Sequence, residues 1–389
     1  MLRRNTFFIS LAFISLAFAL LISGCVVQPI TSETSTELTP AEITPATTPA
    51  AAETTSTPSA ESPASTEALS AQTLANLEYQ LEVVPSGSVQ LTDGIYEDVD
   101  NRIYVSWIDT YAVGELNGEP AAAVILSANT GGSGVFGNLA VVMEQEGAPV
   151  NVATTVVGDR IGLNQIAIAD NEIVLDLVTQ GEDEPMCCGT QRMSVRFALE
   201  DDQLVAASSE IIGEQPQITE TQVITYRPES VPDATETGTE TGSCFTNAIG
   251  LGRADAWRCI TEDSQIYDPC FQMDDAPTIV CGVDPISGEN GFVLELTEPL
   301  PAPDPGEQAM PWLVQLGDGT VCGLMGGTVP GGADWIAPYG CADSVQSYLI
   351  EEFRSEFPAW FAQRVVVDLG DDGFVIKSSV LTPVAAVWK

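Results

Sequence analysis

The sequence predicts a mainly β (α+β) protein, in which an antiparallel curved sheet or partial barrel is followed by a disulfide-stapled β-rich domain with one helix. Three observations predict this class. Between residues 76 and 213, short apolar runs alternate with turn signals such as Asp170-Asn171, which is typical of antiparallel strands. Few stretches there have the 3.6-residue period of a helix. Six cysteines between Cys244 and Cys341 suit a domain held by disulfides.

The N-terminal segment has the parts of an export signal. Arg3 and Arg4 precede an apolar stretch from Phe7 to Ile22, which is shorter than the roughly 20 residues of a membrane span. The stretch ends in Leu21-Ile22-Ser23-Gly24-Cys25, which resembles the lipobox of bacterial lipoprotein precursors. The resemblance implies a signal peptide over residues 1–24 and a lipid on Cys25, which would hold the chain at the outer face of a cell membrane. An ordinary cleaved signal with a chance cysteine is the alternative.

Residues 25–73 follow as a segment rich in Thr, Ala, Ser, Pro and Glu, with no Lys, Arg or aromatic residue. Such a composition cannot bury enough apolar surface to offset the entropy lost on ordering. We therefore expect a disordered tether between the lipid and the folded part of the chain.

The first folded domain is predicted over residues 74–213. Its strands are apolar runs rich in β-branched residues and bounded by Gly, Pro, Asn or Asp. The predicted strands are Val89–Tyr96, Ile103–Ile108, Ala121–Leu126, Leu139–Glu144, Val150–Val157, Gly162–Ile168, Ile173–Val178, Ser194–Leu199 and Gln203–Ser208.

A linker over residues 214–243 separates this domain from a Cys-rich domain over residues 244–389. Within the linker, Gln222–Arg227 could add a strand to the first domain. A helix is predicted from about Asp343 to Phe357, because apolar residues recur there at every fourth position. Strands are predicted near Gly291–Leu296, Pro311–Leu316 and Thr320–Gly323, with a closing hairpin that turns at Gly370–Gly373.

The pairing of the cysteines stays open at the level of sequence, because six allow 15 connectivities. Neighbours along the chain give the simplest set: Cys244–Cys259, Cys270–Cys281 and Cys322–Cys341. The adjacent Cys187 and Cys188 have three options, namely a vicinal disulfide, separate bridges or free thiols.

Charge and composition exclude several classes of function. The chain has 55 acidic and 13 basic residues and no basic patch, so nucleic acid is excluded as a partner. The absence of histidine excludes Ser-His-Asp catalysis and His-containing zinc sites. A mechanism that uses only carboxylates, such as glycoside cleavage by two acids, stays possible. The candidate acids for it are Asp255, Asp268, Asp318 and Asp334.

Two sets of segments resemble known groups of exported proteins. The first likeness covers roughly residues 89–205 and depends on four segments: Gly114-Glu115-Leu116-Asn117-Gly118-Glu119-Pro120, Asn129–Gly134, Gly158-Asp159-Arg160 and Asp183–Cys188. These segments resemble uncharacterised exported domains of Chloroflexota and cyanobacteria. Arg253–Cys259 and Asp268–Phe271 resemble segments of uncharacterised secreted proteins. Neither resemblance implies an activity.

In many relatives the first segment resembles a calcium loop. Here Glu115, Asn117 and Glu119 could supply oxygen ligands, but Pro120 and Ala123 replace the turn glycine and the closing acid. A plain acidic loop between two strands is the alternative, and no other cofactor is indicated.

The loop from Gly331 to Gly340 carries Trp335 and Tyr339 beside Asp334. Fixed aromatic rings beside an acid suit stacking on the sugars of a cell-wall glycan, whereas packing against the neighbouring hairpin is the alternative. We predict a lipid-anchored surface protein that acts as a binding or structural module of the cell envelope, with a glycan or an envelope protein as partner. A carboxylate-dependent hydrolase of extracellular polysaccharide is the competing hypothesis.

Overall fold

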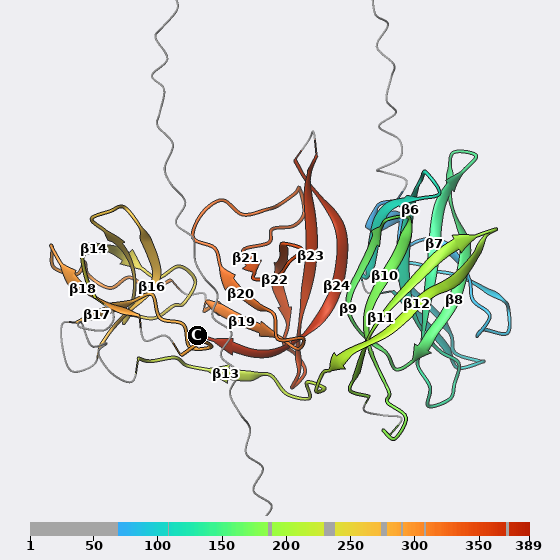
Figure 1. The fold of residues 1–389 in the computed structure, drawn as a ribbon, viewed down its shortest axis with the longest axis horizontal. Coiled ribbons are helices and arrows are strands. Elements are labelled where there is room, and N and C mark those ends of the chain that lie inside the picture. Colours follow the sequence, from blue (N-terminus) through green and yellow to red (C-terminus); the bar gives the residue numbers. More distant parts are fainter. Residues whose placement is uncertain are drawn as a thin grey trace, which may run out of the picture. The chain divides into compact units, whose positions relative to one another are not determined.

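The mainly β class is confirmed by a computed structural model, which describes residues 69–107, 109–185, 189–228, 238–273, 278–288, 291–306, 309–370 and 373–389 (Figure 1). Among these residues the only helix is the single turn α2 (Ala71–Leu74). The hypotheses on Cys25, on most of the tether and on Cys187 and Cys188 lie outside the described residues.

The first region is built from antiparallel strands joined mostly by tight turns. In one sheet the order is β12-β11-β10-β9, while β5, β6, β7 and β8 pair in sequence and β6 also pairs with β4. All the predicted strands are present, although Val89–Tyr96 divides into β2 and β3 at a turn. The strands are β1 (Glu78–Gln80), β2 (Ser88–Gln90), β3 (Ile95–Asp98), β4 (Ile103–Ser106), β5 (Tyr111–Leu116), β6 (Glu119–Asn129), β7 (Phe136–Gln145), β8 (Ala148–Asp159), β9 (Gly162–Ala169), β10 (Glu172–Thr179), β11 (Gln191–Glu200) and β12 (Gln203–Glu214).

Strand β6 is the centre of this region because both of its faces are buried. Alternate residues point to opposite faces of a strand. Ala122, Val124 and Leu126 join a core with α2, β1 and β2, whereas Ala121 and Ala123 join a second core with β9, β10 and β11. A continuous apolar run is what a strand covered on both faces requires.

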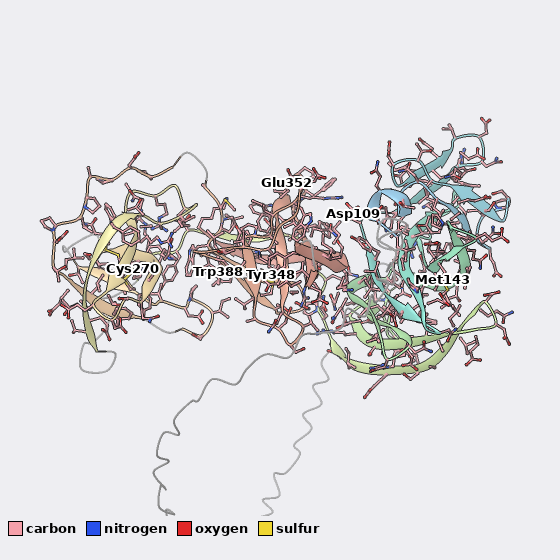
Figure 2. The ribbon with its side chains drawn as sticks, turned by 90° about the horizontal axis from the view of Figure 1, so that it is seen from above. Asp109, Met143, Cys270, Tyr348, Glu352 and Trp388 are labelled. Carbon is pink, nitrogen blue, oxygen red and sulfur yellow. A yellow bond between two sulfur atoms is a disulfide. The ribbon has the colours of Figure 1, made fainter. Side chains whose placement is uncertain are left out.

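The middle region is a closed five-stranded barrel that comprises β14 (Thr239–Asn247), β15 (Ala256–Thr261), β16 (Ile266–Gln272), β17 (Ile279–Cys281) and β18 (Phe292–Leu296). It closes through parallel pairing of β14 with β18. The disulfides Cys244–Cys259 and Cys270–Cys281 lie in its core, and the sulfurs of Cys259, Cys270 and Cys281 are all within 4.8 Å of one another. Figure 2 labels Cys270 among these strands.

The last region is a ring of six strands: β19 (Leu313–Leu316), β20 (Val321–Leu324), β21 (Tyr339–Cys341), β22 (Ser347–Arg354), β23 (Trp360–Gly370) and β24 (Gly373–Trp388). Each pairs with the next, and β19 pairs with β24. The disulfide Cys322–Cys341 joins β20 to β21, so the three neighbour pairings expected for these six cysteines are confirmed. The closing hairpin is also present, with Gly370 paired to Gly373.

Strand β24 links the regions because it is long enough to pair with several partners. Ser378 and Ser379 pair with Ala112 and Tyr111 of β5. Further along, β24 pairs in parallel with β13 (Gln222–Ile224). The segment Gln222–Arg227 therefore contains the expected strand, but that strand joins the last region and not the first.

The predicted helix from Asp343 to Phe357 is wrong, because this segment contains strand β22. A four-residue spacing fits a helix, but it also places residues on one face of a strand, whose period is two. Leu349 is buried and pairs with Tyr339 and Arg364 of the flanking strands, and Phe353 packs beside it on the same core. Phe357 lies past the end of β22 and is exposed.

Candidate ligand cleft

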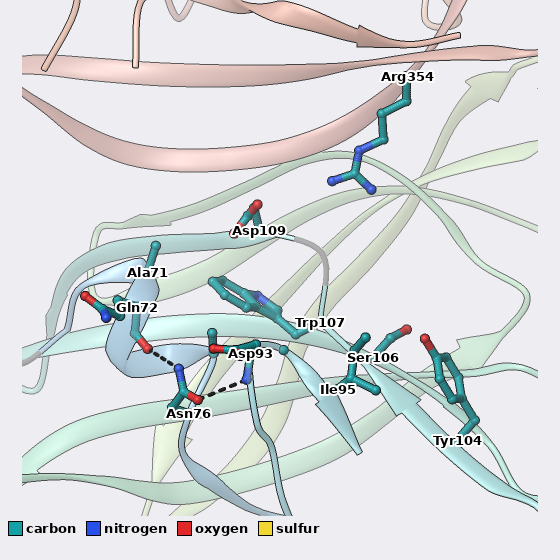
Figure 3. A pocket seen from close by; sticks show the side chains of 12 residues that line it. Ala71, Gln72, Asn76, Asp93, Ile95, Tyr104, Ser106, Trp107, Asp109 and Arg354 are labelled. Carbon is teal, nitrogen blue, oxygen red and sulfur yellow. Dashed lines mark hydrogen bonds between the residues drawn. The ribbon is translucent and has the colours of Figure 1, made fainter. Parts of the chain in front are cut away.

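A polar cleft of about 670 Å³ lies between helix α2 and strands β3 and β4 (Figure 3). Helix α2 is fixed by the Ser70 side chain, which accepts a hydrogen bond from the Thr73 backbone N–H, and by the buried Leu74. The cleft is lined by Ala71, Gln72, Ala75, Asn76, Asp93, Gly94, Ile95, Tyr104, Ser106, Trp107, Asp109 and Arg354.

The turn before β3 is locked to the segment after α2 by amide hydrogen bonds. The Asn76 side chain donates to the Gln72 carbonyl at 3.0 Å and accepts from the Asp93 N–H at 2.9 Å. Gly94 donates to the Ala75 carbonyl and accepts from the Trp107 N–H. A Cβ at Gly94 would lie 2.8 Å from the Trp107 carbonyl oxygen, and its φ of 79° is one that glycine tolerates. One wall of the cleft is therefore a rigid turn.

Two aromatic rings from β4 and the loop after it face the cleft. Tyr104 is 43% exposed, whereas Trp107 is mostly buried and donates its indole N–H to the Thr110 carbonyl at 3.1 Å. The Trp107 ring also packs against Tyr111, with centroids 6.0 Å apart. Because Trp107 is anchored on both sides, it is a fixed aromatic part of the cleft lining, to which Tyr104 adds an accessible phenol.

Asp109 and Arg354 provide charges of opposite sign at the rim. Asp109 is exposed to solvent. Desolvation by the surrounding atoms nevertheless raises the pKa of its carboxyl group, and the charge of Arg354 partly opposes this rise. Burial, with the Asp109 carboxylate adding to it, raises the pKa of the neighbouring Tyr111 to about 12. The cleft thus offers hydrogen-bonding amides and carboxyls, aromatic surface and one cation, which suits a polar ligand with an apolar face.

The structure does not present the aromatic pair that the sequence predicts at the loop from Gly331 to Gly340. Tyr339 is fully buried, donates its hydroxyl to the Pro311 carbonyl at 2.8 Å and packs against Phe353. Trp335 is half-buried and its indole packs over Gly332, while Asp334 is exposed. Tyr339 therefore contributes to the core, and Trp335 and Asp334 have no second exposed ring beside them within this loop.

The three residues suggested for calcium are not brought together. Asn117 and Gly118 form a two-residue hairpin turn with φ of 55° and 81°. Since Leu116 pairs with Glu119, and Glu115 pairs with Pro120, the two glutamates lie on opposite faces of the hairpin. The Asn117 side chain donates to the Leu199 carbonyl and accepts from Asn171. The alternative of a plain acidic turn fits this geometry.

Most of the candidate catalytic acids serve as partners of arginines. Asp255 binds Arg253 through two hydrogen bonds of 2.9 and 2.7 Å, which lower its pKa. Asp318 binds Arg364 at 2.8 Å. Burial raises the pKa of Asp318, but the charge of Arg364 and the hydrogen bonds from Thr320 and Arg364 together lower it below its ordinary value. Arg364 also binds Asp343 at 2.6 Å. These ionised, paired carboxylates are unsuited to donate a proton.

Asp268 differs because burial raises its pKa to about 6, against the opposing effects of the Ile249 N–H and Arg258. Its carboxylate accepts from the Ile249 N–H at 3.2 Å and lies 3.8 Å from the Arg258 Nε atom. A two-acid mechanism needs a second carboxyl group in the same cleft. None of the four candidate acids lines the cleft at α2.

Sequence reasoning missed the cleft because its residues come from distant parts of the chain. The only local indication is Trp107 followed by Asp109 at the end of a predicted strand, where function often lies. Nothing near Arg354 in the sequence marks it as part of the same site.

The chain matches no protein-family model, and no curated protein matches its sequence. The likeness of residues 89–205 to uncharacterised exported domains stays a prediction. Within the described ranges, no helix is both long and apolar enough to cross a membrane. The three disulfides indicate an extracytoplasmic protein.

Proposed function

We propose that this chain is a lipid-anchored binding module of the cell envelope, and that the cleft between α2 and β4 binds a saccharide. The observation that carries the proposal is that the exposed Tyr104 ring and the anchored Trp107 ring line one cleft together with Asn76, Asp93 and Ser106. Sugars present an apolar face of C–H groups and an edge of hydroxyls. The aromatic rings suit the apolar face, and amide and carboxyl groups suit the hydroxyls.

The anchor is proposed from sequence and compartment together. The lipobox-like segment that ends in Cys25 supplies the acceptor, and the disulfides support export. Metabolic labelling with a fatty acid should mark the full chain, and Cys25→Ser should abolish the label. A labelled Cys25→Ser variant would contradict the anchor.

Binding is tested by applying the full chain, solubilised in detergent, to an array of cell-wall and extracellular glycans. We expect Tyr104→Ala to weaken the bound signal about tenfold, since an aromatic platform contributes on the order of 1 kcal/mol or more. Phe357→Ala is the matched control, because Phe357 is a 62% exposed aromatic outside the cleft. Equal losses in both variants, or an array with no bound glycan, would refute the saccharide site.

A further inference from the structure

The arginines of this acidic chain are almost all paired with carboxylates. Those with a carboxylate within 4.0 Å are Arg160, Arg192, Arg196, Arg227, Arg253, Arg258 and Arg364. Among the described arginines, Arg102 and Arg354 have no such partner among described residues. Only Arg354 of these two lines the cleft.

Contacts in the last region place Arg354 at the rim. Arg354 ends β22 and pairs with Phe361 of β23. Two residues further along β23, the Gln363 side chain donates to the Asp109 carbonyl at 2.9 Å and to the Ser379 hydroxyl at 2.6 Å. Figure 3 shows the guanidinium group directed toward the side of the cleft that carries Trp107 and Asp109. Arg354 is therefore an exposed cation that faces the cleft without an ion pair.

An open arginine is unusual in a chain of net charge −42, because acids are abundant and salt bridges form readily at short range. Guanidinium groups bind carboxylates through two parallel hydrogen bonds, a geometry that neutral hydroxyls cannot match. Asp109 lies on the same rim and repels a ligand carboxylate, so it favours the orientation in which the anion faces Arg354.

We propose that the cleft selects saccharides that carry a carboxylate, of the hexuronate class, with Arg354 binding the carboxylate while the sugar ring lies against Tyr104 and Trp107. This inference rests on the proposed saccharide site and adds its specificity. Arg354 acts as a specificity-determining residue, and Asn76, Asp93 and Ser106 serve the ring hydroxyls of either a neutral or an acidic sugar.

The test compares methyl β-D-glucuronide with methyl β-D-glucoside, which differ only in having a carboxylate or a hydroxymethyl group. Binding to the full chain in detergent is measured by ligand-observed NMR. We expect the glucuronide to bind at least about tenfold more tightly than the glucoside in low salt, and the advantage to shrink at high salt. Arg354→Gln should remove the advantage, so that the two sugars bind with similar affinity.

Arg102→Gln is the matched control, because Arg102 is also exposed and unpaired among described residues but lies outside the cleft. It should leave the preference intact. Equal binding of the two sugars, or the same effect from both variants, would overturn the carboxylate specificity while the saccharide site stands. Acetate that binds as tightly as the glucuronide would also overturn it. Failure of both sugars together with an empty glycan array would instead refute the proposed function itself.

Discussion

The barrel and the first region both consist of β-strands (Figure 1), yet different forces hold their cores together. The buried core of the barrel consists of Trp257, Ile279 and Leu294 with four cysteines, all in disulfides. The two cores of the first region consist of aliphatic and aromatic side chains, with no cysteine among their described residues.

The length of particular core strands contributes to this difference. Barrel strand β17 has 3 residues and β18 has 5, whereas β6 has 11 and β7 has 10. Short strands bury little apolar surface, and a small unit then needs covalent cross-links to limit the entropy of its unfolded state. Long strands covered on both faces bury enough surface without them.

Removing both barrel disulfides is expected to have the largest effect. Replacing Cys244, Cys259, Cys270 and Cys281 by alanine should lower barrel stability by about 5 kcal/mol, since each bond contributes roughly 2–4 kcal/mol. Hydrogen exchange followed by mass spectrometry should show that β14 to β18 lose protection while β6 and β7 keep it. The control removes Cys322 and Cys341 and should leave the barrel protected. If the barrel stays protected without its two disulfides, they do not hold its core together.

A cavity created by mutation tests whether aliphatic packing stabilises the first region. Leu139 on β7 is fully buried, so Leu139→Ala should lower the free energy of unfolding by about 3–4 kcal/mol. The expected result is faster exchange in β6 and β7 with an unchanged barrel. Leu369→Ala is the control, because Leu369 is 72% exposed, and it should change stability by less than about 0.5 kcal/mol. Equal losses of stability in the two variants would show that aliphatic packing does not stabilise this region.

The barrel should also respond to pH through Asp268. Burial raises the pKa of Asp268 from 3.8 to about 6, so the folded barrel holds this proton more tightly than the unfolded chain. The stabilisation of the folded barrel by this tighter proton binding is complete below about pH 4 and is lost as the pH rises to about 6. The free energy of unfolding should fall by about 2–3 kcal/mol across this window. Urea unfolding followed by tryptophan fluorescence should show that Asp268→Asn flattens the pH dependence of the midpoint in this window. Asp334→Asn, at an exposed position, should leave the slope as it is.

The smallest expected effect concerns the Asn117-Gly118 turn of the first region. Asn117→Ala should cost about 1–2 kcal/mol, because alanine resists the φ of 55° and loses the side-chain bonds to Leu199 and Asn171. Asn117→Gly keeps the backbone freedom and should cost less. Thermal unfolding of the two variants measures the difference, and equal losses would assign the whole effect to the hydrogen bonds. Millimolar calcium should not raise either melting temperature, since Glu115 and Glu119 face apart.

Local patterns predicted a large part of the fold. The strands of the first region follow from apolar runs bounded by turn residues, and the simplest pairing of neighbouring cysteines is the one that the structure shows. The helix prediction near Leu349 failed because a four-residue spacing is shared by helix and strand. The binding loop prediction failed for Tyr339 because composition does not reveal which side of a short strand faces the core.

The sequence by itself determined the β class and the exclusion of histidine chemistry, because each depends on residue types or on neighbours along the chain. It left the pairing of the six cysteines open, and the structure selected the neighbour pairs. Only the tertiary structure decided that β24 pairs with β5 and that Arg354 reaches a cleft built around Trp107. Such contacts join residues far apart in sequence, and they form only when the packing of whole strands selects one register among many.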